Sequence, residues 1–175
     1  MKSILNYLYK NTKPWRPRSE VYIIKNQKLV VGYVNNNNWS GYVIPGGGID
    51  YGETPEKAAK RECLEEVGVK VKDLKLISAK KIAYQENTDS GVVNAAKYSR
   101  EFSGAIFMTF IGYFDGYNDK KHNQHDSYEL KEITFDEAIR FFDKNTKAQQ
   151  KSSDVYNYEK SKYVLETLKK IKSLV

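Results

Sequence analysis

Cysteine, proline and long apolar runs are all scarce in this chain of 175 residues. Cys63 is the one cysteine, so no disulfide forms within the chain, which excludes a disulfide-stabilised scaffold and indicates a reducing compartment. Four prolines and eleven glycines exclude a collagen-like repeat. Apolar stretches fall short of the ~18 residues of a membrane span, and residues 1–10 lack the apolar run of a signal peptide. We therefore expect a soluble, cytoplasmic protein with no membrane partner.

The residues that are present favour one globular domain with an uneven charge. Hydrophobic residues make up 40% of the chain and aromatic residues 13%, which is sufficient for a packed core. Lys and Arg number 29 against 22 Asp and Glu, a net charge of +7. Residues 47–69 hold six acids and three bases, so this segment is −3 and the remainder is +10. An acidic segment in a basic chain indicates a divalent-cation site among surfaces that attract anions, although a solvated basic surface gives the same composition.

Periodicity and turn residues predict an α/β protein with a long N-terminal extension to its core. We divide it into an N-terminal segment (1–19), one domain (20–145) and a C-terminal helix packed on that domain (146–175). Strands are predicted over 21–24, 29–34, 42–44, 74–84, 104–114 and 130–135. Helices are predicted over 3–11, 54–67, 136–142 and 153–173. The polar stretches 85–103 and 115–127 are either substrate-facing loops or plain surface.

The helix predicted after Thr54-Pro55 has one acidic face and one apolar face. Glu62, Glu65 and Glu66 lie within about a third of its circumference at 100° per residue, and Cys63 lies on the opposite arc. Like charges at these spacings cost a few tenths of a kcal/mol per pair unless something compensates them. Hard divalent ions prefer carboxylate oxygens, so the face is either a metal site beside the preceding glycine loop or a solvated acidic surface.

The spacing of the glycine loop and the helix resembles the signature of the Nudix hydrolases. Gly47 is followed by five residues, Glu53, seven residues and then the segment from Arg61 to Val69, which reads Arg-Glu-Cys-Leu-Glu-Glu-Val-Gly-Val. Every fixed position of the family's motif, the Nudix box, is matched, with Cys63 in place of a bulkier hydrophobic residue. The resemblance covers about residues 20 to 145. It implies an α/β/α sandwich with a mixed β-sheet, to which this chain adds a C-terminal helix.

The resemblance also implies roles for residues of the box. Glu62, Glu65 and Glu66 are expected to share the roles of metal ligands and base, with Mg²⁺ or Mn²⁺ as the cofactor, and the Gly47 carbonyl to add a ligand. Arg61 and Glu53 are expected to position the glutamates, or to be structural. Glu129 is our choice for a general base outside the box, with Asp126 nearby. His122 and His125 are taken as surface residues, because they lack a metal-binding helical spacing.

The substrate is the least determined part of the prediction. The resemblance implies hydrolysis of a nucleoside diphosphate linked to another group, and we expect a nucleoside triphosphate or related small nucleotide. RNA is the alternative, with cleavage at its 5′ end, and a nucleotide-sensing domain without turnover is a third reading. Candidates for holding base and phosphates are Trp15, Arg16, Arg18, Trp39, Tyr42 and, weakly, Tyr84. The sequence leaves open whether the C-terminal helix caps a monomer or builds a homodimer.

Overall fold

Apolar and β-branched runs build a mixed sheet at the centre of the computed structural model, which describes residues 13–37, 39–84, 101–118, 128–152 and 154–175. Its strands are β1 (Trp15–Lys25), β2 (Lys28–Asn35), β3 (Ser40–Val43), β4 (Gly46–Gly48), β5 (Val69–Ala83), β6 (Gly104–Tyr117) and β7 (Glu129–Ile133). The strand order is β3-β2-β1-β6-β5, with β4 paired to β1 and β7 to β2. The β1–β6 pair is parallel and the other pairs are antiparallel.

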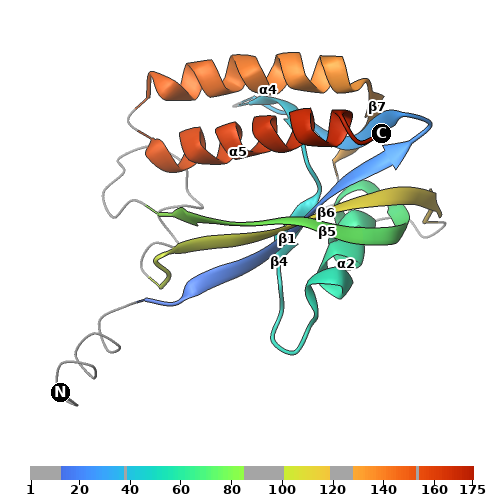
Figure 1. Cartoon of the computed structure of the whole chain (residues 1–175), viewed down its shortest axis with the longest axis horizontal. Helices are drawn as coiled ribbons and strands as arrows, with labels where there is room; N and C mark the ends of the chain where they lie inside the picture. The colour runs from blue at the N-terminus through green and yellow to red at the C-terminus, as the bar shows by residue number, and fades with distance from the viewer. Residues whose placement is uncertain (1–12, 38, 85–100, 119–127, 153) are drawn as a thin grey trace.

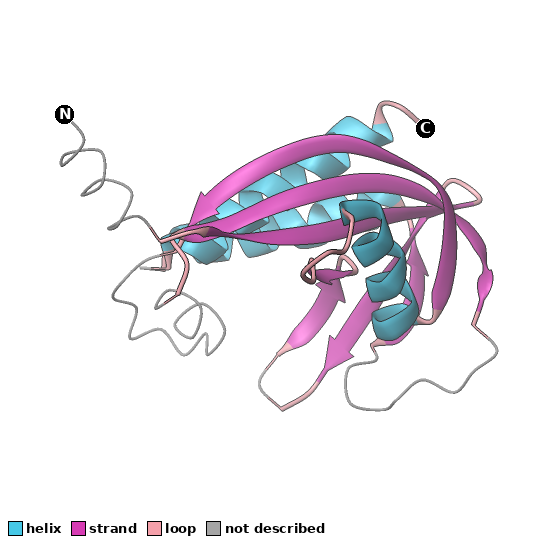
Figure 2. Ribbon diagram, turned by 90° about the horizontal axis from the view of Figure 1, so that it is seen from below, coloured by secondary structure: helices cyan, strands magenta, loops and turns pink. Residues whose placement is uncertain are grey.

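Helices cover both faces of this sheet. Helix α2 (Pro55–Val67) lies against one face, and α4 (Phe135–Gln150) and α5 (Val155–Lys172) lie against the other (Figures 1 and 2). Side chains alternate along β1, so that Val21 and Ile23 pack with α2 while Tyr22 and Ile24 pack with α4 and α5. The two cores lie on opposite sides of one strand, and the prediction of an α/β/α sandwich with a mixed sheet is confirmed.

Helix α2 begins and ends where its sequence predicts. The Thr54 hydroxyl accepts a hydrogen bond of 3.3 Å from the Lys57 amide, and Pro55 takes the first helical position. Gly68 has a φ of 69°, a left-handed conformation that favours glycine, and its amide donates to the Cys63 carbonyl. Ala58, Ala59, Cys63 and Val67 are buried against the sheet. The opposite side of the helix is therefore left for charged residues.

Other elements differ from their predicted bounds. Strand β1 begins at Trp15 rather than after Pro17, because Trp15 to Pro17 pair with residues 104–106 of β6. The glycines predicted as a loop form β4, which pairs with β1 from Arg18 to Glu20. Helix α4 extends to Gln150, well past residue 142. The prediction ended too early because the last two turns are mostly polar and none of their residues is buried. Strand β5 starts at Val69 rather than at Leu74; Val69 and Val71 are buried and pair with β6, and the register shifts between Lys72 and Lys75.

Several predictions fall outside the described residues or are not tested by them. The helix predicted over 3–11, most of the two long polar stretches, and Asp126, His122 and His125 lie outside the described residues. The division at residues 19/20 and 145/146 stays a prediction, and its second boundary falls inside α4. Among the described residues, no helix combines the length and the apolar composition that crossing a membrane requires.

Candidate active site

A short strand of three glycines positions the backbone around the acidic face of α2. Ser19 of β1 pairs with Gly47, and the flanking bonds run from Val21 N to Pro45 O and from Ile49 N to Pro17 O. In an antiparallel pair the peptide groups alternate in direction, so those of Gly47 face β1 and those of Gly46 and Gly48 face away. The Gly46 amide donates to Glu66 Oε2 at 2.8 Å, which confirms this direction.

The lack of a side chain at Gly47 leaves room for the Glu62 carboxylate. A Cβ atom at this position would overlap the carboxylate of Glu62, so only glycine lets that carboxylate lie against the strand. Contrary to the expectation from the resemblance, the Gly47 carbonyl faces β1 and not the acidic side chains, whereas the Gly46 carbonyl accepts from Arg18 and the Gly48 carbonyl from Arg61. The reason is the pairing of the glycines with β1, which no feature of the sequence predicted.

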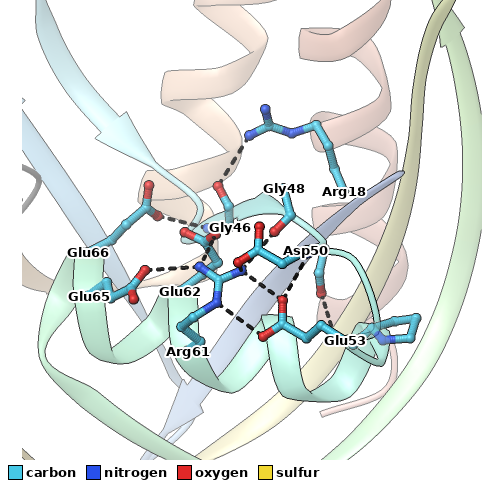
Figure 3. Close-up of polar contacts among 11 residues, drawn as sticks. Arg18, Gly46, Gly48, Asp50, Glu53, Arg61, Glu62, Glu65 and Glu66 are labelled. Atoms are coloured by element: carbon cyan, nitrogen blue, oxygen red, sulfur yellow. Dashed lines mark hydrogen bonds and ion pairs between the residues drawn. The ribbon is translucent and has the colours of Figure 1, made fainter. Parts of the chain in front are cut away.

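Arg61 lies at the centre of the charged cluster, as Figure 3 shows. Its Nε and Nη2 donate to the two carboxylate oxygens of Glu53 at 3.1 and 2.9 Å. Its Nη1 donates to Glu62 at 2.7 Å and to Glu65 at 3.0 Å, and Nη2 also donates to the Gly48 carbonyl at 2.8 Å. The hydrogen bonds to Glu53, above all, raise the pKa of Arg61 and hold the pKa of Glu53 below its usual value. One guanidinium thus ties the helix to the glycine strand.

Glu62 and Glu66 differ from the other glutamates of the helix because they are largely withdrawn from water. Burial raises the pKa of Glu62, an effect opposed by Arg61. Burial raises the pKa of Glu66 to about 7, the nearby Glu62 charge adds to the rise, and the Gly46 amide opposes it. Glu65, in contrast, has a side chain that is 55% exposed. Two carboxylates are therefore held close together in a medium that disfavours their charge, with one guanidinium shared among three acids.

The other residues singled out from the sequence lie in several places. Arg18 reaches the glycine strand, where Nη2 donates to the Gly46 carbonyl at 3.3 Å. Glu129 is on β7, its carboxylate is exposed, and it pairs with Lys131 rather than with the acidic face. Trp39 is 43% exposed beside β3. Of these three residues, Arg18 contacts the glycine strand beside the cluster, whereas the contacts of Glu129 and Trp39 with the described residues do not involve the acidic face.

The two candidate tyrosines pack against the helices of the opposite face. The Tyr42 hydroxyl donates to Glu137 at 2.6 Å and its ring packs edge-on against Phe141, with centroids 5.0 Å apart. Tyr84 is buried and packs against Tyr156, also at 5.0 Å. Their described contacts are those of core residues.

Two features of the site were not found from the sequence. The Tyr128 amide donates to the Glu66 carbonyl at 2.7 Å. The Tyr128 side chain also hydrogen-bonds the Glu66 carboxylate, which lowers the pKa of Glu66. Nothing in the local sequence links residues so far apart. Glu20 is 4% exposed and pairs with Lys160 of α5. A carboxylate inside the apolar strand β1 was the one signal that could have marked it.

Comparison with known proteins decides the family. The family model described as the NUDIX domain matches residues 14–156, most of the chain. The chain belongs to the Nudix family. This agrees with the Nudix box from Gly47 to Val69, whose charged residues meet in the cluster around Arg61. Strand β1 from Trp15 lies within the matched range, as do the Nudix helix α2 and all of α4.

Relatives and solved structures share either part of the sequence or the Nudix fold. An RNA pyrophosphohydrolase of Actinobacillus succinogenes is 40% identical over 70 residues, 39% of this chain and 34% of that protein. One of Vibrio atlanticus is 44% identical over 62 residues, 29% of this chain and 36% of that protein. The chain thus spans about a third of the length of these relatives.

Solved structures resemble about three quarters of the chain. A NUDIX hydrolase from Nitrosomonas europaea aligns with a TM-score of 0.56 at 17% identity, covering 74% of this chain and 78% of that one. A mutator MutT protein from Bacillus halodurans gives 0.52 at 20% identity and covers 72% of each chain. At these identities the likeness concerns the fold alone.

Proposed function

We propose that this protein is a metal-dependent Nudix hydrolase that cleaves a phosphoric anhydride bond in a nucleoside triphosphate or another nucleoside diphosphate-linked compound. Water attacks phosphorus in this reaction. The observation that carries the proposal is the pair of largely buried carboxylates, Glu62 and Glu66, held against a glycine strand that has no side chain in their way.

The donor set fits a hard divalent cation such as Mg²⁺ or Mn²⁺. Carboxylate and peptide oxygens are the ligands such ions prefer. Glu62 and Glu66 supply the carboxylates, and burial raises the pKa of both, to which a neighbouring carboxylate charge adds in each case. Within the described residues no group of three or more His, Cys, Asp or Glu is gathered closely enough to hold a metal, and Glu62 and Glu65 both accept hydrogen bonds from Arg61. The fit therefore rests on the chemistry of the donors.

The roles follow from exposure and contacts. Glu62, Glu66 and the Gly46 carbonyl would hold the cation, which neutralises phosphate oxygens and lowers the pKa of a bound water when it is present. Glu65 is the most exposed of the three glutamates. Its carboxylate would give up its hydrogen bond from Arg61 and bind the cation or the attacking water instead. Arg61 and Glu53 position the others through their mutual hydrogen bonds. Glu129 stays a candidate for the base only if its strand or the residues before it move toward Glu66.

An RNA 5′ end is the second candidate substrate. The two relatives compared above are RNA pyrophosphohydrolases, and the chain carries a net charge of +7, with +10 outside the box. A polyanion held by lysines and arginines releases counterions on binding, so its affinity falls steeply as salt rises. Turnover of a small nucleotide depends less on salt, and this difference separates the two substrates.

The proposal is tested by incubating the full chain with Mg²⁺, and separately with Mn²⁺, against a panel of phosphoric anhydrides. The panel contains NTPs, dNTPs, oxidised dGTP, dinucleoside polyphosphates, nucleotide sugars and 5′-triphosphorylated RNA, with products separated by chromatography. Glu66→Gln removes a carboxylate of the site, and Glu56→Gln makes the same change on an exposed residue of α2. We expect turnover by the wild type and by Glu56→Gln, with loss of at least about 100-fold in Glu66→Gln. Metal-dependent binding without turnover would replace the hydrolase with a nucleotide sensor.

A further inference from the structure

The glycine strand separates two charged faces of opposite sign. Gly47 has the Glu62 carboxylate where a Cβ would be, and a Cβ on Gly48 would lie 3.2 Å from Nη2 of Arg16 on the other side. Arg16, Arg18 and Glu20 alternate along β1 on the same face as Tyr22, the α5 side, and Glu20 pairs with Lys160 of α5. Arg16, Arg18 and Lys160 thus give the α5 side three cations near one acid.

Arg18 is poised between the two faces. In Figure 3 its guanidinium lies across the glycine segment from Arg61. Within the described part of the chain its side chain donates one hydrogen bond, to the Gly46 carbonyl, and its Cζ lies 5.8 Å from the centre of the Phe107 ring. A guanidinium has five N–H donors, and among the described residues no carboxylate forms an ion pair with this one. Arg18 therefore has donors to spare for an anion.

Lys160 brings a second cation to the same ring. Its ammonium group lies 3.8 Å from the centre of Phe107, and its side chain is 26% exposed. Glu20, which is almost fully buried, holds it in place with one ion pair, although an ammonium has three donors. Burial lowers the pKa of Lys160, the Glu20 charge opposes this, and the Arg18 charge adds to the lowering. The two cations both lie near the Phe107 ring and repel each other, and an anion that binds both relieves that repulsion.

We propose that Arg18 and Lys160 form an anion subsite that holds a phosphate group of the substrate, other than the phosphorus that is attacked. The subsite rests on the proposed function, because its ligand is a second phosphate of the same molecule. The substrate then crosses β4, with the scissile anhydride at the acidic face of α2 and the further phosphate on the α5 side. Charge-assisted bonds from a guanidinium and an ammonium match the several acceptor oxygens of one phosphate.

Substrates with three or more phosphates or a 5′-triphosphate end gain most from such a subsite. A molecule with only the scissile pyrophosphate reaches one face of the strand, whereas a longer chain reaches both. Glu20 sets the orientation of Lys160 and reduces the net positive charge of the subsite. Its removal is therefore expected to strengthen anion binding, provided that the protein still folds.

The test measures binding of inorganic tripolyphosphate to the full chain by titration calorimetry, at fixed ionic strength and without divalent metal. Lys160→Met and Arg18→Met are each expected to raise the Kd about tenfold, and Lys160→Arg to stay within about twofold of the wild type. Lys162→Met is the matched control, because Lys162 is an exposed lysine of the same helix. Glu20→Gln keeps the shape of the side chain and is expected to lower the Kd several-fold.

A purely structural ion pair gives a different pattern. Lys160→Met and Glu20→Gln would then both lower the melting temperature. A Kd for tripolyphosphate that stays at the wild-type value in Lys160→Met, or that stays there or rises in Glu20→Gln, overturns the subsite. If Lys160→Met does not fold by circular dichroism, Arg18→Met and Glu20→Gln decide in the same way.

The substrate panel separates this inference from the proposed function. Tripolyphosphate binding needs no turnover, so an inert wild type would refute the hydrolase while the Kd pattern still tests the subsite. With an active wild type, we expect KM to rise about tenfold in Lys160→Met and kcat to change less than about twofold, because only phosphate binding is lost. A fall in kcat with unchanged KM would overturn the subsite and leave the hydrolase standing.

Discussion

Glu66 is expected to make the folded protein less stable as pH rises, when divalent cations are absent. Burial raises its pKa from 4.5 to about 7, so the folded state binds this proton more tightly than the unfolded chain does. Ionisation of Glu66 therefore costs stability: the cost is absent below pH 4.5, grows between 4.5 and about 7, and is complete above that. At ~1.4 kcal/mol per pKa unit, the rise from 4.5 to about 7 corresponds to a loss of about 3.5 kcal/mol over the whole range.

The assay is urea denaturation of the full chain at pH 5 and pH 8 in the presence of EDTA. Glu66→Gln cannot ionise, so its free energy of unfolding should fall by about 2 kcal/mol less than that of the wild type between these pH values. Glu56→Gln on the exposed side of α2 should behave as the wild type does. Adding Mg²⁺ or Mn²⁺ at pH 8 should restore stability to the wild type more than to Glu66→Gln. Equal losses in the wild type and in Glu66→Gln would refute the burial argument.

Three further substitutions test the account, two of them in the acidic site and the third at Tyr42, away from that site. Arg61→Ala leaves the carboxylates of Glu53, Glu62 and Glu65 without their shared cation and should cost about 2 kcal/mol of unfolding free energy in urea; an unchanged midpoint would contradict this. Gly47→Ala places a Cβ on the Glu62 carboxylate and should lower kcat at least about 100-fold, whereas retained turnover would show that the carboxylate can move freely. Tyr42→Phe loses the bond to Glu137 and should cost about 1 kcal/mol with KM unchanged; a raised KM would return Tyr42 to the substrate site.

The Nudix helix was predictable because its signals are local. The cap at Thr54, the proline after it and the left-handed Gly68 fix its ends within a few residues of the chain. Its acidic face follows from the helical period alone, and the Nudix box gave the family, which the comparisons confirm. The mixed sheet between helices followed from the resemblance and is confirmed as well.

The parts that sequence reasoning missed depend on distant pairing. Glycines have low strand propensity, so β4 forms because β1 offers an edge for it. This pairing turns the Gly47 carbonyl toward β1 and leaves the Gly46 and Gly48 carbonyls to accept from Arg18 and Arg61. Helix α4 runs to Gln150 although its last turns lack an apolar stripe.

The roles of single residues also depend on contacts between segments that are far apart in the sequence. Tyr42 and Tyr84 have the chemistry to stack on a base, but Phe141 and Tyr156, from helices late in the chain, cover them. Lys160 meets Glu20 across 140 residues of sequence, and neither residue belongs to a motif. Contacts of this kind are set by how α5 packs on the sheet, which the pattern of either segment alone does not encode.

The most direct measurement of the central claim is hydrolysis in ¹⁸O-labelled water, using the panel substrate with the highest turnover, Mg²⁺, and mass spectrometry of the products. We expect one ¹⁸O atom in a phosphate product of the wild type and of Glu56→Gln, and background levels with Glu66→Gln. Label absent from every phosphate product, or equal incorporation by Glu66→Gln and the wild type, would contradict water attack at phosphorus by the glutamate site.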